Sequence, residues 1–120
     1  MKKIIFLIFI SSMVFSQKKD IVEESFEVNG VCKMCKARIE KTAFKQKGVK
    51  NAEWDINNHL LTVLYDKSKI DINKIHKSIA EIGHDTSKEE APDEVYDNLP
   101  MCCLYNRNEI KKGKRKKKFC

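Results

Sequence analysis

Two cysteines, Cys32 and Cys35, have the spacing to do chemistry in this chain of 120 residues. They lie where the turn signal Asn29-Gly30 is followed by a helical pattern. Thiols at positions i and i+3 across the start of a helix can point at one atom, and free backbone N–H groups lie nearby. The pair therefore indicates either a soft-metal site or a thiol–disulfide redox centre.

Positive charge around this pair favours the thiolate, which is the form that binds a soft metal or attacks a disulfide. The N-terminal end of the helix dipole contributes part of that charge, and Lys33 and Lys36 add more. We expect the two lysines to offset the negative charge of a complex with two thiolates.

The remaining cysteines are an adjacent pair, Cys102-Cys103, and the terminal Cys120, so the total of five is odd. Short loops gain little from a disulfide, so tight clusters of thiols favour metal or redox chemistry. A structural disulfide between Cys32 and Cys35 is the alternative. The adjacent pair could supply further ligands, form a second soft-metal site with Met101, or close a disulfide within its own segment.

Two thiolates alone suit Cu(I), which accepts low coordination, whereas structural zinc expects four ligands. Zinc would need further ligands, such as Cys102 and Cys103. We hypothesise that the segment carrying Cys102 and Cys103 folds back over the Cys32 loop. Cys120 is expected to be incidental.

The elements that position the cysteines follow from the hydrophobic periodicity. Strands are expected over residues 21–28, 49–56 and 59–66, with a short last strand over 84–88, and helices over 35–46 and 72–82. Gly48 and Gly83 end the two helices. Trp54 and the isoleucines of the second helix belong in the core, whereas His59 and His76 are expected at the surface. The order βαββαβ predicts an α+β, ferredoxin-like open-faced sandwich with two helices on one face of an antiparallel sheet.

At this point the chain resembles the heavy-metal-associated domain family. The matching features are the Cys32-x-x-Cys35 motif, Ile39-Glu40, Gly48-Val49, the strand Leu61-x-Val63-x-Tyr65-Asp66, and Ile82-Gly83-His84-Asp85. The resemblance covers residues 25–88. It implies one soft ion held between two thiolates and passed on by ligand exchange, with Hg(II) added to the candidate ions by the family's precedent.

Two departures from the family pattern bear on the site. Gly30 stands where the family usually has a methionine buried under the metal loop, and Met34 lies between the cysteines instead. His84 occupies a position that is often tyrosine or phenylalanine and lies beside the metal loop, so an imidazole there could reach the ion. The resemblance therefore adds His84 to the candidate ligands.

The two ends of the chain have their own signatures. Residues 1–16 predict a secretory signal peptide, with Lys2-Lys3, an apolar run over 4–15 and cleavage between Ser16 and Gln17. The apolar run is shorter than the roughly 20 residues that a membrane span needs. An uncleaved N-terminal anchor is the alternative.

The net charge of +7 comes from the ends of the chain. Seven basic residues lie in 111–118 and two in the signal, which leaves 15 basic and 17 acidic residues between, a charge of −2. The domain is therefore not basic, and this argues against nucleic acid as a partner. We expect the lysine-rich tail to be disordered, with an anionic envelope surface as a possible contact.

These observations predict a non-enzymatic, exported metal carrier, chaperone or scavenger in the periplasm or outside the cell. Its expected parts are a signal peptide (1–16), a heavy-metal-associated domain (17–88), a cysteine-containing extension (89–110) and a basic tail (111–120). Cu(I) is the expected ion, with Zn(II) or Hg(II) as alternatives. A metal-transporting membrane protein or another metal-binding domain is the expected partner. The rival class is a thiol–disulfide redox protein using the same two cysteines.

Overall fold

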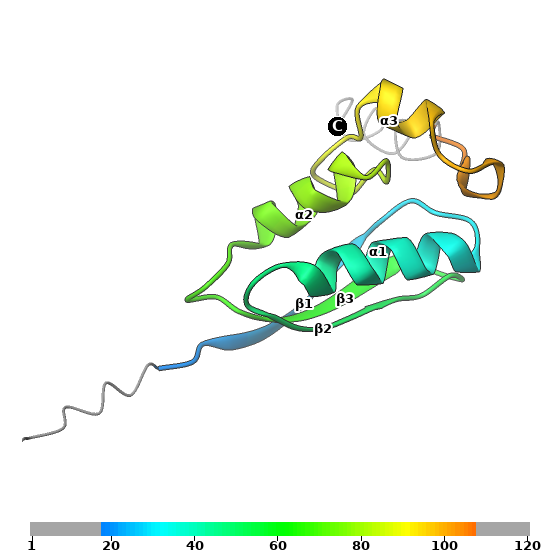
Figure 1. Ribbon diagram of the computed structural model, residues 1–120. Helices are drawn as coiled ribbons and strands as arrows, with labels where there is room; N and C mark the ends of the chain where they lie inside the picture. Colours follow the sequence, from blue (N-terminus) through cyan, green and yellow to red (C-terminus); the bar gives the residue numbers. More distant parts are fainter. Residues whose placement is uncertain (1–17, 108–120) are drawn as a thin grey trace, which may run out of the picture.

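The computed structural model describes residues 18–107 as a three-stranded antiparallel sheet with two helices on one of its faces (Figure 1). The elements are β1 (Ile21–Glu27), α1 (Lys33–Lys45), β2 (Val49–Trp54), β3 (Leu60–Asp66) and α2 (Ile72–Glu81), followed by the short α3 (Asp93–Asp97) and the 3₁₀ turn η1 (Met101–Cys103). This arrangement confirms the predicted α+β, ferredoxin-like class.

The sheet has the strand order β1-β3-β2. The central strand β3 therefore pairs with β1 on one side and with β2, which precedes it in the sequence, on the other. Phe26 of β1 and Trp54 of β2 both lie opposite Leu61 of β3. Because side chains alternate across a strand, these residues share the face that the helices cover, and all three are buried. Trp54 is therefore in the core, as predicted.

The expected last strand over 84–88 is reduced to a single bridge between Val28 and Thr86. The Thr86 hydroxyl accepts hydrogen bonds from the backbone N–H groups of Lys88 and Glu89. The Thr86 N–H in turn donates to the Glu89 carbonyl, so residues 86–89 form a turn where further strand pairing would be needed. The short last strand predicted over 84–88 is therefore limited to this bridge.

Helix α1 begins at Lys33, two residues earlier than expected, and Cys32 is its N-cap residue in an extended conformation. Cys32 makes no side-chain cap hydrogen bond. Cysteine is not among the usual cap residues, so the sequence held no cap signal at this point. At α2 the signal was present, and Asp71 caps that helix by accepting from the Asn73 N–H.

His76 was expected at the surface, and this was wrong, because the side chain is buried under β1. Its ring lies 3.7 Å from that of Phe26, and its Nδ1 lies 2.7 Å from the Thr86 hydroxyl. Burial lowers the pKa of His76 to about 4, so the imidazole is neutral near pH 7. His59, also expected at the surface, is half-buried and stacks on Trp54.

Residues 89–107 pack onto the domain. Leu99, Cys103 and Tyr105 are buried in the same apolar cluster as the core of the domain. Gly83 has a φ of +106°, and a Cβ there would lie 2.9 Å from a methyl carbon of Leu99. Glycine at this turn therefore allows the left-handed backbone conformation and also leaves space for the Leu99 side chain.

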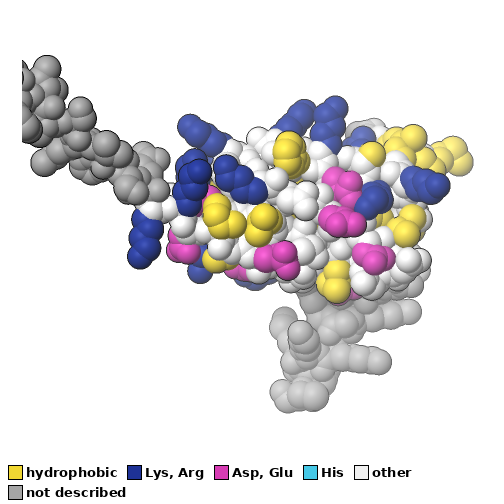
Figure 2. Space-filling model, turned by 90° about the horizontal axis from the view of Figure 1, so that it is seen from below, with side chains coloured by type: hydrophobic (Ala, Val, Ile, Leu, Met, Phe, Trp, Pro, Cys, Tyr) yellow, Lys and Arg dark blue, Asp and Glu magenta, His cyan; other side chains and the backbone are white. Residues whose placement is uncertain are grey.

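The face seen from below carries basic, acidic and scattered hydrophobic side chains intermixed (Figure 2). No helix among residues 18–107 is long and apolar enough to cross a membrane. The predicted signal peptide, the basic tail and Cys120 lie outside the described residues.

Candidate metal centre

The Cys32 and Cys35 sulfur atoms lie 3.4 Å apart at the start of α1. Cys32 is partly exposed, whereas Cys35 is buried in the core. The expected geometry, two thiols close enough to share one ion, is present. The helical spacing had placed the second thiol at the edge of the buried stripe of Ile39 and Ala43, and Cys35 is fully buried with them.

The surroundings of Cys32 favour its thiolate. Burial by itself would raise the pKa, but hydrogen bonds from the Cys35 N–H and thiol, the Met34 N–H and the Cys103 thiol outweigh it. Together they lower the pKa of Cys32 to about 7. The main contribution thus comes from the first turn of the helix, where N–H groups have no partner within the helix.

Lys36 does not take the role expected of it. Its ammonium group pairs with Glu40 one helical turn on and donates to the backbone carbonyl of Trp54, 2.8 Å away. Because both interactions hold the ammonium group at β2, Lys36 ties α1 to the sheet. Lys33, the other lysine expected beside the thiolates, is exposed at the first position of the helix.

The loop over residues 29–32, which carries Cys32 and is called the metal loop here, packs against the indole of Trp54. A Cβ at Gly30 would lie 3.0 Å from the indole and 3.1 Å from the Cβ of Cys35, so the absence of a side chain lets the ring pass under the loop. The indole N–H donates to the Val28 carbonyl, 3.1 Å away. Trp54 thus fills the space beneath the loop, where the family resemblance placed a methionine from the loop itself. The small residue at position 30 was the only sequence signal for this arrangement.

The second cysteine pair lies beside the first. The sulfur atoms of Cys32, Cys102 and Cys103 all lie within 4.8 Å of one another, and Cys103 is 3.8 Å from Cys32. Cys103 is buried, whereas Cys102 is exposed and donates to the Met34 sulfur, 3.6 Å away. The segment therefore lies against the Cys32 loop, as the fold-back hypothesis has it.

Met101 was considered as a helper in a second soft-metal site, but its side chain is 90% exposed. The methionine sulfur that contacts Cys102 belongs to Met34 instead. Burial raises the pKa of Cys103, and the neighbouring thiols Cys35 and Cys32 raise it further. In the metal-free protein Cys103 is therefore a neutral thiol near pH 7.

His84 does not join the cluster of sulfur atoms. Its ring is buried and its Nδ1–H donates to the Asn29 carbonyl, 2.8 Å away. Burial lowers the pKa of His84, so the ring is neutral. Its role in this structure is to hold the loop that carries Cys32 against the turn after α2, with the Asn29 N–H donating to the Asp85 carbonyl beside it.

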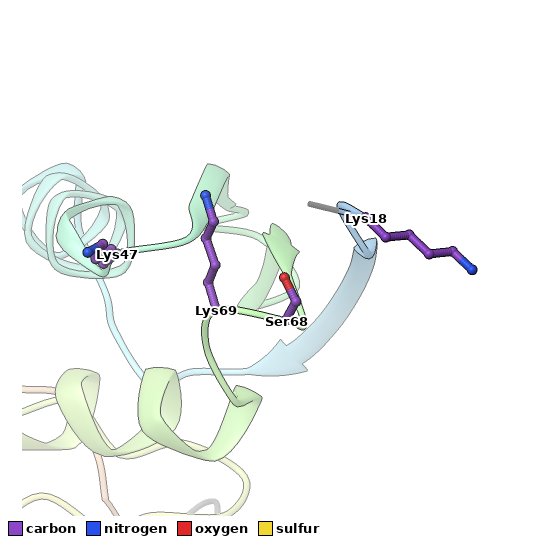
Figure 3. Close-up of a pocket in the computed structure, with 4 residues that line it drawn as sticks. All are labelled: Lys18, Lys47, Ser68 and Lys69. Atoms are coloured by element: carbon purple, nitrogen blue, oxygen red, sulfur yellow. The ribbon is translucent and has the colours of Figure 1, made fainter. Parts of the chain in front are cut away.

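A separate cavity of about 610 Å³ lies at the far end of α1. Lys18, Lys47, Ser68 and Lys69 line it, and in Figure 3 the Lys18 side chain extends away from the other three. It holds no thiol or imidazole, so it offers a soft ion no ligand.

A family model of the heavy-metal-associated domain matches residues 25–85, which include Cys32 and Cys35 but neither Cys102 nor Cys103. The chain belongs to the heavy-metal-associated domain family. Domains of this family bind metal ions, and the match confirms the resemblance seen in the sequence. None of the curated proteins that were compared matches the chain.

Solved structures give the same result. The chain is similar to the metallochaperone CopZ, with 29% identity and a TM-score of 0.53 over 54% of this chain and 98% of that one. It is also similar to the water-soluble region of the P-type ATPase CopA from Bacillus subtilis, with 27% identity and a TM-score of 0.54 over 57% of this chain and 46% of that one. Oxidized MerP from Ralstonia metallidurans CH34 shares the fold at 22% identity and a TM-score of 0.53, over 55% of this chain and 93% of that one.

Proposed function

We propose that the protein is an exported carrier for a soft metal ion, most simply Cu(I), with Cys32 and Cys35 as its primary ligands. The observation that carries the proposal is the pair of sulfur atoms 3.4 Å apart at the N-terminus of α1 in a heavy-metal-associated domain. The protein breaks no bond in a substrate, so the proposal assigns no catalytic residue.

The choice of Cu(I) follows from the ligands. Thiolates select soft ions, and Cu(I) is stable with fewer ligands than the four that structural zinc prefers. The similarity to the metallochaperone CopZ supports the same choice. Hg(II) fits the thiolates as well, and the titration below separates the ions.

Export and delivery are part of the proposal. The basic start and apolar run of residues 1–16 support export, and the mature chain would then begin at Gln17. Delivery would proceed by ligand exchange with a metal-transporting membrane protein or another metal-binding domain. Val31 and Met34, both about half exposed beside Cys32, offer such a partner an apolar rim.

The test is an anaerobic titration of the reduced mature protein with Cu(I), Zn(II) and Hg(II), beside a Cys32→Ser, Cys35→Ser double variant. We expect one tightly bound Cu(I) per chain in the wild type and loss of that site in the double variant. The matched control is Ala37→Ser, an exposed change on the same helix that leaves both thiols and both lysines in place. Equal binding by the double variant would contradict the proposal.

The same preparation decides the rival redox function. A thiol–disulfide oxidoreductase would turn over a disulfide reporter substrate at a rate that depends on Cys32. We expect stoichiometric metal binding with little turnover. Rapid turnover without metal retention would replace the carrier with a redox protein.

A further inference from the structure

The segment over residues 99–107 brings a third sulfur to the metal loop. We propose that this segment is a clamp that supplies Cys103 as a third thiolate, so that the ion is held in a three-coordinate site by Cys32, Cys35 and Cys103. The inference rests on the proposed function and adds a ligand from outside the family domain.

The sulfur spacing supports three ligands. At a metal–sulfur bond length of about 2.3 Å, two thiolates in line hold their sulfur atoms about 4.6 Å apart, whereas three in a trigonal plane hold theirs about 4.0 Å apart. The sulfur atom of Cys32 lies 3.4 Å from that of Cys35 and 3.8 Å from that of Cys103. Both distances require less movement to reach the trigonal arrangement than the linear one.

Burial separates Cys103 from its neighbour Cys102. Cys103 and Cys35 belong to one buried cluster, and the partly exposed Cys32 packs against it. Cys102 is on the solvent side, where it contacts Met34. In the turn η1 the two adjacent side chains point in different directions, so Cys103 faces the core and Cys102 faces the solvent.

Arg107 holds the C-terminal end of the clamp segment against the domain. The Arg107 guanidinium makes two hydrogen bonds of 2.9 Å to the Asp85 carboxylate, one to each oxygen. It also donates to the Ala91 carbonyl at 2.7 Å and lies over the ring of Tyr96. Such two-pronged pairs are both strong and specific in geometry. Asp85 is almost fully buried, so this ion pair is shielded from water.

Tyr105 adds a second fastening at the same turn. Its hydroxyl donates to the Gly83 carbonyl and accepts from the Asp85 N–H, at 2.7 and 2.8 Å. Leu99 fills the space above Gly83 at the other end of the segment. Cys103 lies between these contacts, and η1 is held beside the start of α1 (Figure 1).

The clamp and the metal loop are fastened to the same short turn. The Asp85 carboxylate accepts from Arg107, and the Asp85 N–H donates to the Tyr105 hydroxyl. The Asp85 carbonyl also accepts a hydrogen bond from the Asn29 N–H, and its neighbour His84 donates to the Asn29 carbonyl. Cys32 follows Asn29 by three residues. The distance between Cys103 and Cys32 is thus set by one continuous set of hydrogen bonds.

This arrangement changes how the ion leaves. In a two-thiolate site a partner's thiolate can enter an open position on the ion. Here the incoming thiolate must first displace Cys103, so the clamp favours retention over rapid transfer.

The test measures the number of sulfur ligands by X-ray absorption on the reduced Cu(I) protein, and the affinity by competition with a Cu(I) chelator. We expect three sulfur ligands in the wild type. Cys103→Ser should leave two and weaken binding about 10-fold or more, since even ligand-supporting groups are worth that much. Cys102→Ser removes the other sulfur that lies within 4.8 Å of Cys32 and Cys103. Because Cys102 is exposed, we expect this variant to keep three ligands and wild-type affinity, and a loss of one ligand would assign the third position to Cys102 and overturn the clamp.

The outcomes separate the two proposals. Failure of the wild type to bind Cu(I), or full binding without Cys32 and Cys35, would overturn the carrier itself. A wild type that binds one Cu(I) through two or four sulfur atoms, or a Cys103→Ser variant unchanged in ligand number and affinity, would overturn only the clamp.

Arg107→Gln tests the positioning role with every thiol still present. We expect a fall in sulfur ligands from three towards two and an affinity loss of up to about 10-fold, with the urea unfolding of the domain little changed. Arg107→Lys, which keeps the charge but not the two-pronged pair, should recover part of the loss. Three ligands at wild-type affinity in Arg107→Gln would show that the arginine does not set the site.

Discussion

Each of the two cysteine pairs has one buried thiol and one more exposed thiol, but they are held by different kinds of structure. Cys32 and Cys35 belong to the first turn of a 13-residue helix packed on the sheet. Cys102 and Cys103 lie in a three-residue 3₁₀ turn, and side-chain hydrogen bonds further along the segment fix its position. Regular structure places the first pair, whereas a few polar contacts place the second.

This difference has an energetic consequence. In the first pair, Cys35 is fully buried in the domain core, so its position is as stable as the fold. The second pair depends on contacts that can break locally, and such segments open at a lower free energy than the fold as a whole. The site therefore combines a rigid half with a half that can open.

The largest expected effect comes from removing the support of the rigid half. Trp54→Ala deletes a fully buried ring under the metal loop and should lower the free energy of unfolding by about 3–5 kcal/mol. Urea denaturation of the reduced protein, followed by circular dichroism, measures this loss. A change below about 1 kcal/mol would contradict the role of the indole as the platform of the loop.

Leu99→Ala is the matched change in the other half. It removes the side chain that packs on Gly83, and we expect hydrogen-exchange protection to fall in residues 93–107 while the strands and α1 keep theirs. Loss of protection throughout the domain would show that the two halves unfold together.

A smaller effect is expected from restoring the family's residue at the loop. Gly30→Met places a side chain where the indole already lies, and overpacking of this kind costs about 1–3 kcal/mol. Urea denaturation should show destabilisation of the metal-free protein, and Gly30→Ala should show a smaller one. An increase in stability would mean that Trp54 can leave its place at little cost.

The mildest test uses only pH. Because the pKa of Cys32 is lowered to about 7, its thiolate fraction and its alkylation rate should rise to half their maximum near pH 7, instead of near the ordinary value of about 8.5. Cys103, whose pKa is raised, should be alkylated more slowly than Cys32. Iodoacetamide labelling of the reduced, metal-free protein, read by peptide mass, checks both statements. Faster labelling of Cys103 than of Cys32 would contradict the comparison.

The sequence was sufficient for the fold class and for the first pair because both depend on local periodicity. The alternation of the strands and the isoleucine stripe of α2 repeat every few residues, and the Asp71 cap acts on a residue two positions away. The start of α1 was placed two residues late because cysteine is not a typical cap residue. His76 was placed at the surface because a polar residue beside an apolar stripe does not reveal a buried partner such as Thr86.

The clamp could not be derived from local patterns. Arg107 meets Asp85 across 22 positions, and Cys103 meets Cys32 across 71. The adjacent cysteines suggested further ligands, but nothing local distinguished the inward Cys103 from the outward Cys102. Neither Arg107 nor Tyr105 belongs to a sequence motif, so no local pattern indicated their contacts with Asp85.

The chain contains a single tryptophan, and its indole lies against the backbone at Gly30 and next to Cys35. Heavy ions quench indole emission at short range, so occupancy of the thiols should be visible as a fall in the protein's own ultraviolet fluorescence. The ring that supports the loop would therefore report the binding of an ion to the thiols without any added label.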